Sequence, residues 1–183
     1  GDMDVSRLDE KPPGRMPVDT RLVNLERLSE TADAVVRAVS GGAKVYWVCP
    51  LVEESEKIDL AAADQRYAHL RARLGERVAL IHGKMKPTEK DAAMESFSGH
   101  SENGAKVLVA TTVIEVGVDV PDATIMVIEH AERFGLAQLH QLRGRIGRGG
   151  KSGTCLLLYA APLTETAKAR LAKLRETDDG FLI

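Results

Sequence analysis

Short apolar runs alternate along the chain with longer segments in which apolar and polar residues are mixed. An apolar run of about four to eight residues, bounded by glycine, proline or polar residues, is typical of a strand buried on both faces of a sheet. This pattern predicts strands at residues 21–24, 44–49, 77–81, 106–110, 124–129 and 154–159.

The mixed segments carry apolar residues at helical spacing. The first repeats them at i, i+3, i+4 and i+7 from Ala32 to Val39, which predicts an amphipathic helix that ends at Gly41-Gly42. Proline is favoured in the first turn of a helix and threonine at the N-cap, so Pro87 and Thr164 each mark a helix start. The predicted helices run from about 29 to 40, 58 to 74, 87 to 97, 136 to 143, and from 164 onward.

Strands and helices alternate about five times, which predicts an α/β fold with a mainly parallel sheet and helices on both faces. Functional groups in such sheets gather outside the carboxyl ends of the strands. Residues 1–20 contain three prolines and are typical of an extended, turn-rich linker. We therefore expect the folded domain to occupy residues 21–176.

Residues 140–150, His-Gln-Leu-Arg-Gly-Arg-Ile-Gly-Arg-Gly-Gly, hold three arginines and four glycines. Arginine presents a planar fork of donors that suits phosphate oxygens, and glycine leaves room for an anion to come close. We predict that a helix ends near Arg143 and that Arg145 and Arg148 project from the turn that follows. Two arginines directed at one point indicate a polyphosphate, whereas Arg143 falls within the expected helix.

Polar side chains follow two of the predicted strands. Thr111 and Thr112 precede a loop that contains glycine, and they either donate to phosphate oxygens or cap a turn. Asp119 is suited to accept hydrogen bonds from a ribose or, again, to cap a turn. Taken alone, His82 is typical of a satisfied loop histidine and Lys84 of a solvated charge.

Composition narrows the class of protein. The 183 residues suffice for one domain with a sizeable core, and 44% hydrophobic and 28% charged residues are ordinary for a globular protein. A net charge of −2 and 4% aromatic residues argue against a broad basic or aromatic surface for nucleic acid. Cys49 and Cys155 lie in apolar runs without metal-ligand spacing, which favours buried, reduced thiols in the cytoplasm. No apolar stretch reaches 18 residues, so we expect no membrane span.

The arginine segment does not form a complete phosphate-binding loop. Its glycines lack the G-x-G-x-x-G spacing of a dinucleotide-binding loop, and they follow a helix where that loop follows a strand. A Walker A loop, G-x-x-x-x-G-K-[ST], is absent from the sequence. The chain is therefore expected to supply half of a phosphoryl-transfer site. A non-catalytic interaction module and a stand-alone nucleotide-binding enzyme are the alternatives; the arginine pair argues against the first and the missing loop against the second.

Two segments together resemble the motifs of a known family. Residues 141–148 resemble motif VI of superfamily 2 helicases, Q-x-x-G-R-x-G-R, and residues 110–119 resemble motif V at the family's spacing ahead of motif VI. Residues 12–15, 48–56 and 132–150 are similar to the RecG family of bacterial DNA helicases. Transcription-repair coupling factors share much of the last of these segments and are the nearest alternative.

The resemblance implies roles in binding and hydrolysing ATP. Arg145 and Arg148 match the arginine fingers of the family, and Gln141 matches a residue near the γ-phosphate. Gly117 and Asp119 match motif V residues at the nucleotide, where the acid contacts the ribose. No residue of this chain is implied as a metal ligand.

The resemblance also implies contacts with DNA. Thr111 and, with it, Thr112 match the threonine that contacts the DNA backbone. The loop His82-Gly83-Lys84 lies where related translocases touch the tracked strand. Val116 stands where RNA-dependent relatives often have arginine, which counts against an RNA helicase.

The family has two RecA-like lobes that close on ATP, and the resemblance implies that this chain is the second lobe, a three-layer α/β/α domain. Residues 1–20 would then link it to a first lobe that carries the Walker A lysine and the Mg²⁺ ligands, and residues 177–183 would begin a further segment. The implied activity is ATP-dependent translocation on branched DNA, at replication forks and recombination intermediates, by a monomer in the bacterial cytoplasm. The isolated chain is expected to be inactive.

Overall fold

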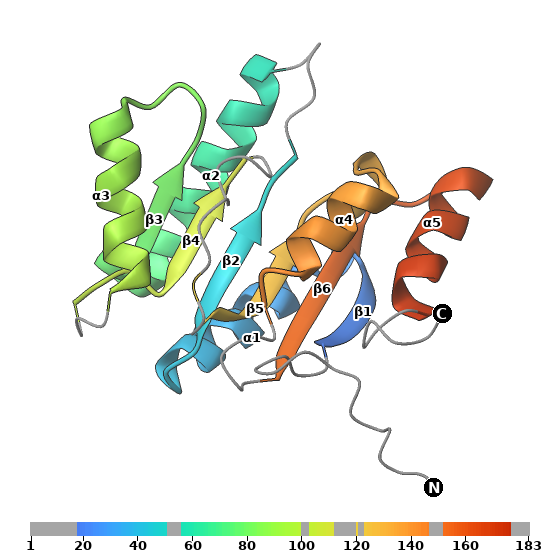
Figure 1. Cartoon of the computed structure of the whole chain (residues 1–183), viewed down its shortest axis with the longest axis horizontal. Helices are drawn as coiled ribbons and strands as arrows, with labels where there is room; N and C mark the ends of the chain where they lie inside the picture. Colours follow the sequence, from blue (N-terminus) through green and yellow to red (C-terminus); the bar gives the residue numbers. More distant parts are fainter. Residues whose placement is uncertain are drawn as a thin grey trace, which may run out of the picture.

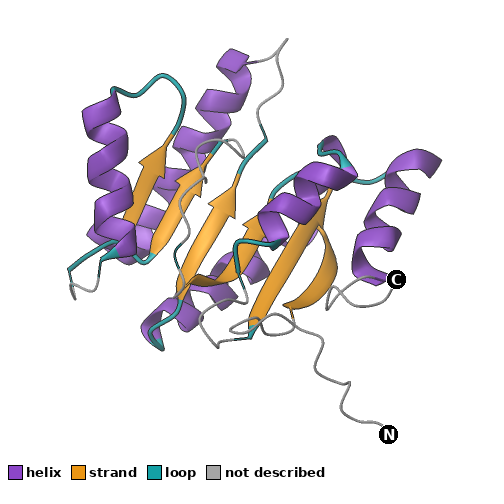
Figure 2. Ribbon diagram, in the orientation of Figure 1, coloured by secondary structure: helices purple, strands orange, loops and turns teal. Residues whose placement is uncertain are grey.

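The computed structural model contains one parallel sheet (Figures 1 and 2), and it describes residues 18–50, 56–99, 103–111, 120, 123–146 and 152–176. Within these residues the strands are β1 (Val18–Asn24), β2 (Lys44–Val48), β3 (Val78–Ile81), β4 (Val107–Ala110), β5 (Ala123–Ile128) and β6 (Gly153–Tyr159). Their order across the sheet is β1-β6-β5-β2-β4-β3, and every neighbouring pair is parallel. The predicted parallel sheet is confirmed.

Helices cover both faces of this sheet (Figure 1). In the described part of the chain they are α1 (Leu28–Ser40), α2 (Glu56–Leu74), α3 (Pro87–Ser98), α4 (Leu136–Arg143) and α5 (Glu165–Glu176). Short 3-10 turns precede α1, β3 and α4, namely η2 (Leu25–Arg27), η4 (Gly75–Arg77) and η6 (Ala131–Arg133). Helices α1 and α2 pack on one face, and α3, α4 and α5 pack on the other, which confirms the three-layer α/β/α fold.

The central strand β2 shows why the fold needs both helical layers. All five of its residues are buried, because β2 lies between β5 and β4; residues 45–48 carry apolar side chains on both faces, and Lys44 donates to the carbonyl of Gly99 at 2.7 Å. Tyr46 packs in the layer that contains Phe97 of α3, and Trp47 packs in the layer that contains Leu70 of α2. Burial of one large apolar side chain contributes about 1.5–3 kcal/mol.

The predicted helix ends are also confirmed. After α1, Gly42 has a φ of 100°, and after α2, Gly75 has a φ of 64°, a left-handed conformation that glycine adopts without steric cost. Pro87 is the first residue of α3. The hydroxyl of Thr164 accepts a hydrogen bond from the backbone N of Ala167 at 3.0 Å, so Thr164 caps α5.

Strand β1 is longer than the hydrophobic pattern predicts. It begins at Val18, so residues 18–20, which we expected in the linker, belong to the sheet and pair with β6. Val18 and Thr20 are buried, whereas Asp19 and Arg21 are exposed and form an ion pair at 2.8 Å. β1 is an edge strand with alternating side chains, and a search for uninterrupted apolar runs therefore misses its first half.

Candidate functional site

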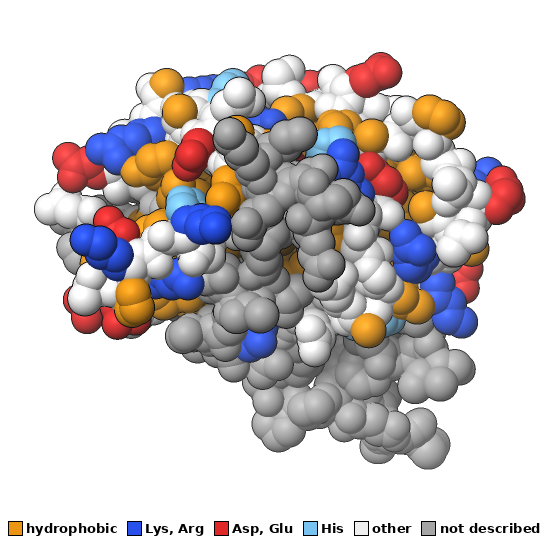
Figure 3. Space-filling model, turned by 90° about the horizontal axis from the view of Figure 1, so that it is seen from above, with side chains coloured by type: hydrophobic (Ala, Val, Ile, Leu, Met, Phe, Trp, Pro, Cys, Tyr) orange, Lys and Arg blue, Asp and Glu red, His pale blue; other side chains and the backbone are white. Residues whose placement is uncertain are grey.

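The strands all point the same way, so the residues that follow them share one edge of the sheet (Figure 1). Ile81 at the end of β3 pairs with Ala110 at the end of β4. The next residues, His82 and Thr111, are therefore brought together at this edge. In Figure 3, which views the molecule from above, basic, acidic and hydrophobic side chains are intermingled over the described surface.

Thr111 is fully buried, and its hydroxyl has no hydrogen-bond partner in the described part of the chain. A buried hydroxyl without a partner costs about 1–3 kcal/mol. The hydroxyl therefore does not cap a turn among the described residues, which was the alternative to a phosphate contact. Thr112, Gly117 and Asp119 lie outside the described residues.

The loop His82-Gly83-Lys84 forms a turn directly after β3. Nδ1 of His82 accepts a hydrogen bond from the backbone N of Lys84 at 3.2 Å, and the carbonyl of His82 accepts one from Met85 at 3.1 Å. His82 is half-buried, while Gly83 and Lys84 are exposed. The imidazole thus has the local partner of an ordinary loop histidine, and the exposed part of the turn is what a ligand would reach.

Helix α4 carries the arginine segment and ends at Arg143, as predicted. The backbone N of Arg145 donates to the carbonyl of Leu142 at 3.0 Å, so the chain continues in a tight turn. Ile146 is fully buried and fixes the far side of this turn, which we call the arginine turn (residues 144–146). Arg145 is half-buried, and Gln141 is exposed on α4.

The arginine turn and the edge that carries His82 and Thr111 occupy different parts of the lobe. α4 starts near the carboxyl end of β5 and runs back across the face of the sheet, so its last turn lies over the middle of that face (Figure 1). Gln141 thus lies on α4 and Arg145 in the turn that follows it, whereas His82 and Thr111 follow the paired ends of β3 and β4. Arg148 lies outside the described residues.

Arg143 is buried and anchors α4. Its guanidinium donates to the carbonyl of Leu174 at 2.7 Å, in the last turn of α5, and to the hydroxyl of Thr20 in β1 at 3.3 Å. Nδ1 of His140 lies 3.3 Å from the same guanidinium. Burial and, after it, the charge of Arg143 lower the pKa of His140. Arg143 is 5% exposed, so it belongs to the scaffold and not to the predicted pair of fingers.

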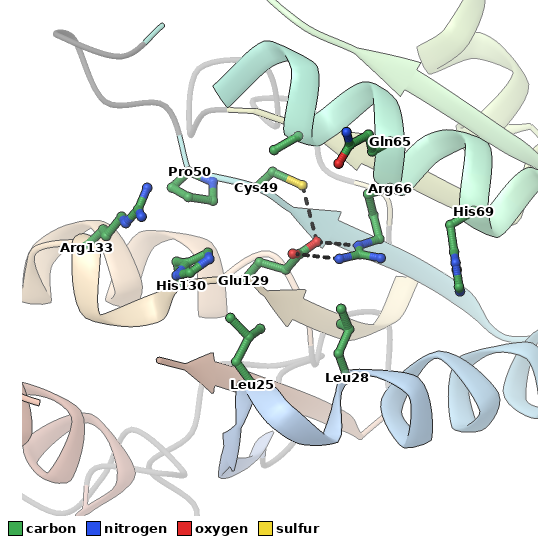
Figure 4. A pocket seen from close by; sticks show the side chains of 11 residues that line it. Leu25, Leu28, Cys49, Pro50, Gln65, Arg66, His69, Glu129, His130 and Arg133 are labelled. Carbon is green, nitrogen blue, oxygen red and sulfur yellow. Dashed lines mark hydrogen bonds and ion pairs between the residues drawn. The ribbon is translucent and has the colours of Figure 1, made fainter. Parts of the chain in front are cut away.

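A polar cluster that the sequence did not reveal lies at the carboxyl ends of β2 and β5 (Figure 4). The carboxylate of Glu129 accepts two hydrogen bonds from Arg66 of α2, at 2.7 and 3.1 Å. It also accepts one from the indole of Trp47 at 2.6 Å and one from the thiol of Cys49 at 3.5 Å. We call these four residues the Glu129 cluster. Glu129 itself is 8% exposed.

Within the Glu129 cluster, Arg66 keeps its positive charge. Burial alone would lower the pKa of Arg66, but the hydrogen bond and the charge of Glu129 outweigh it and raise that pKa. The guanidinium of Arg66 also lies 5.7 Å from the centre of the Trp47 ring. A cavity of about 470 Å³ opens beside the cluster and is lined in addition by Leu25, Leu28 and other residues, none of them a predicted nucleotide or DNA contact.

One signal in the sequence could have located this cluster. Trp47 lies within an apolar strand, and a buried indole N–H requires an acceptor. Glu129 follows another apolar strand directly, and a carboxylate in that position is suited to be the acceptor. The identity of the cation, Arg66 of α2, depends on tertiary packing and has no local signal.

The connection from β5 to α4, residues 129–135, is held at several points. His130 has φ 51° and ψ 51°, a left-handed conformation that no other non-glycine residue adopts in the described part of the chain. This conformation costs about 1–2 kcal/mol. Glu132 accepts a hydrogen bond from the backbone N of Ala160 at 3.0 Å through Oε1, and its Oε2 lies 3.0 Å from Nδ1 of His130.

The described residues contain no group of three or more His, Cys, Asp or Glu side chains that could hold a metal ion. Cys49 and Cys155 are both buried, as predicted, and neither forms a disulfide. Among the helices that the structure describes, none has the length and apolar character needed to span a membrane.

Comparison with known proteins identifies the family. The helicase conserved C-terminal domain family matches residues 15–150. The ATP-dependent DNA helicase RecG of Acidithiobacillus ferridurans is 52% identical over 184 aligned residues, and that of Escherichia coli K12 is 51% identical. Each alignment covers 100% of this chain and 26% of the relative, so the chain spans about a quarter of the length of these curated relatives.

Solved structures agree with the sequence comparison. RecG bound to a three-way DNA junction matches with a TM-score of 0.74 and 43% identity, over 94% of this chain and 22% of that chain. Yeast Dbp5 bound to RNA and ADP BeF3 matches with a TM-score of 0.60 at 16% identity, over 98% of this chain and 43% of that chain, which shows a shared fold. The predicted resemblance to superfamily 2 helicases, and to RecG among them, is confirmed. This chain belongs to the helicase conserved C-terminal domain family.

Proposed function

We propose that this chain is the second motor lobe of an ATP-dependent DNA helicase or translocase that acts on branched DNA. The observation that carries the proposal is the arginine turn, in which Arg145 follows a helix that Arg143 anchors at its end. The relatives named ATP-dependent DNA helicase RecG, and the RecG structure bound to a three-way DNA junction, support the choice of DNA and of ATP.

Arginine fingers explain why the chain has phosphate-directed arginines but no Walker A loop. Phosphoryl transfer spreads negative charge over the γ-phosphate oxygens, and an arginine supplied from across a cleft stabilises that charge by a factor of about 10³–10⁵ in rate. In the proposed site, Arg145 and Arg148 are the fingers, and Gln141 lies beside the γ-phosphate. Gly117 and Asp119 complete the contacts to ATP, the latter at the ribose.

The rest of the ATP site belongs to a first lobe. This chain has no Walker A loop, and in the proposed site the first lobe supplies the phosphate cradle and the Mg²⁺ ligands. Hydrolysis then requires the two lobes to close on ATP, because neither lobe holds the complete set of charges. One chain with both lobes completes the site, and the protein therefore acts as a monomer. The relatives cited above are bacterial, which supports a role in the bacterial cytoplasm.

The edge that carries Thr111 and His82 is the proposed DNA contact. The hydroxyls of Thr111 and Thr112 donate to phosphate oxygens, and the exposed turn at Gly83 and Lys84 follows the same strand of DNA. The unpartnered hydroxyl of Thr111 supports this role, because a phosphate oxygen would satisfy it. Thr111 is fully buried here, so the contact forms only after this strand end rearranges. Opening and closing of the lobes would couple that rearrangement to the ATP cycle and produce steps along DNA.

The decisive experiment replaces Arg145 in the two-lobe protein. Arg145→Ala is expected to lower the ATP turnover number by about 10³-fold or more, because the finger acts on the transition state. ATP affinity should change little. The measurements are steady-state ATP hydrolysis with forked DNA and a titration with a fluorescent ATP analogue. Arg37→Ala, in an exposed position on α1, is the matched control and should leave both values unchanged.

Equal losses of turnover and ATP affinity would reduce Arg145 to a binding residue and contradict the finger role. The isolated chain provides a second test. It should hydrolyse ATP no faster than buffer, with or without DNA, and DNA-stimulated turnover by the pure chain would overturn the half-site proposal.

A further inference from the structure

Glu129 is fixed at both its backbone and its side chain. Its backbone N donates to the carbonyl of Val48 at 2.9 Å, which extends the pairing of β5 with β2 by one residue. Its carboxylate is held by Arg66 of α2 and by Trp47 of β2. Two elements, β2 and α2, therefore fix the position of the chain where it leaves β5.

The residue that follows is held in a conformation it would not adopt alone. His130 is left-handed, and such a conformation persists in a non-glycine residue only where the surrounding structure imposes it. The Glu129 cluster holds the chain on one side of His130. On the other side, the carboxylate of Glu132 accepts a hydrogen bond from Ala160 at the end of β6.

The geometry of this connection sets the direction of α4. The short turn η6 follows His130 at once, and Phe134, which is 5% exposed, closes the connection before α4 begins. No flexible spacer lies among these described residues, so a change at Glu129 is transmitted to the start of α4. The arginine turn lies at the other end of this eight-residue helix, so the orientation of α4 depends on both the Glu129 end and the Arg143 anchor.

We propose that Glu129, held by Arg66, is a positioning residue for the arginine turn. It touches neither ATP nor DNA. It fixes the left-handed turn at His130 and thereby the orientation in which α4 presents Arg145 to the γ-phosphate. This inference rests on the proposed function, since it needs Arg145 to act as a finger.

The test uses the two-lobe protein with Glu129→Gln and Arg66→Met, each of which removes the ion pair while keeping a side chain of similar size. Because small misplacements of a catalytic group lower rates by up to about 100-fold, we expect each variant to lower the ATP turnover number by about 10-fold or more. The KM for ATP and the affinity for forked DNA should stay within about twofold.

A second readout separates positioning from general loss of stability. Affinity for ADP with aluminium fluoride, which mimics the transferring phosphoryl group, should fall in proportion to the turnover number. Affinity for a non-hydrolysable ATP analogue should remain unchanged. The double variant should be no worse than the more impaired single variant, because both changes remove the same ion pair. Arg66→Lys, which keeps the charge, should recover part of the turnover.

Arg73→Met is the matched control. Arg73 lies on the same helix and pairs with Asp33 of α1 at 2.6 Å, in an exposed ion pair that joins α2 to α1. It should leave turnover and transition-state-analogue affinity unchanged. All measurements are made at a temperature at which circular dichroism shows every variant folded.

Unchanged turnover in Glu129→Gln and Arg66→Met would overturn the inference, and so would equal losses of affinity for both nucleotide analogues. Neither result would contradict the proposed function if Arg145→Ala still abolished ATP hydrolysis. Normal ATP turnover in Arg145→Ala would instead contradict the proposed function itself.

Discussion

A buried polar side chain follows both β4 and β5, but only the one after β5 has hydrogen-bond partners among the described residues. At the end of β5, the carboxylate of Glu129 accepts hydrogen bonds from Arg66, Trp47 and Cys49. At the end of β4, the hydroxyl of Thr111 is fully buried but has no partner among the described residues. The first arrangement is closed, and the second lacks an acceptor.

The difference separates scaffold from site. A buried polar group that is fully hydrogen-bonded fixes the geometry of its neighbours and has no capacity left for a ligand. A buried group without a partner destabilises the fold, and its presence is explained when something outside the lobe completes it. By this criterion the end of β5 shapes the lobe, and the end of β4 is the place for an external oxygen acceptor, such as a phosphate of DNA.

The largest expected effect is a loss of stability when the Glu129 cluster at the end of β5 is disrupted. Glu129→Ala leaves the half-buried guanidinium of Arg66 without its counter-charge, and loss of one partner of such a pair costs about 3 kcal/mol, the lower end of the range for fully buried pairs. We expect the free energy of unfolding of the 183-residue chain to fall by about this amount in urea denaturation. Glu76→Ala, at an exposed position in η4, is the control and should change it by less than about 0.5 kcal/mol.

A small loss of unfolding free energy for Glu129→Ala, comparable with that of the control, would show that the hydrogen bonds of Glu129 contribute little to stability. The contrast with Thr111 would then have no basis.

A pair of threonine variants sharpens the comparison. Thr20→Val removes a buried acceptor that Arg143 uses and should destabilise the chain by about 1–3 kcal/mol. Thr111→Val removes a hydroxyl without a partner and should be neutral or stabilise the chain by up to about 1 kcal/mol. Both are measured by urea denaturation, and equal destabilisation by the two variants would mean that Thr111 has a partner in the fold.

In the two-lobe protein, the same Thr111→Val change should lower the ratio of DNA-stimulated to basal ATP turnover, because the proposed phosphate contact loses its donor. The measurement is ATP hydrolysis as a function of forked-DNA concentration. A ratio equal to that of the parent would remove Thr111 from the DNA contact.

The smallest expected effect is a pH dependence. His140 has a lowered pKa in the folded chain, through burial and then the charge of Arg143, so the folded state binds its proton less readily than the unfolded state does. Its contribution to stability is therefore complete above the unfolded value of about 6.5 and is lost as the pH falls below it. His140→Gln should flatten this part of the profile of Tm against pH between pH 5 and 8. Parallel profiles for the parent and the variant would contradict the shift.

The regular part of the fold follows from local sequence, because a buried strand must be apolar on both faces and an amphipathic helix must repeat with its own period. Edge strand β1 departs from this apolar pattern at Asp19 and Arg21, which face solvent. The Glu129 cluster departs from it as well. Its members come from β2, α2 and the end of β5, and only the folded sheet places them side by side.

The arginine segment shows the same limit within a few residues. Arg143 and Arg145 are equivalent as sequence, two arginines beside a glycine. Arg143 is buried because Leu174 and Thr20 approach it from distant parts of the chain, whereas Arg145 falls in the turn after the helix. The sequence predicts the helix end between them, which is enough to separate their roles, but it does not predict the partners that make Arg143 an anchor.

The pairing of β1 with β6 has a consequence for synthesis of the protein. β6 lies between β1 and β5, and Val18 pairs with Gly153, so β1 cannot join the sheet until β6 has left the ribosome. At about 5–20 residues per second, that interval is on the order of ten seconds. During this time the backbone of β1 is an unpaired template for other chains. The alternating charges of Asp19 and Arg21, which concealed this strand in the hydrophobic pattern, then protect the nascent chain from pairing with its neighbours.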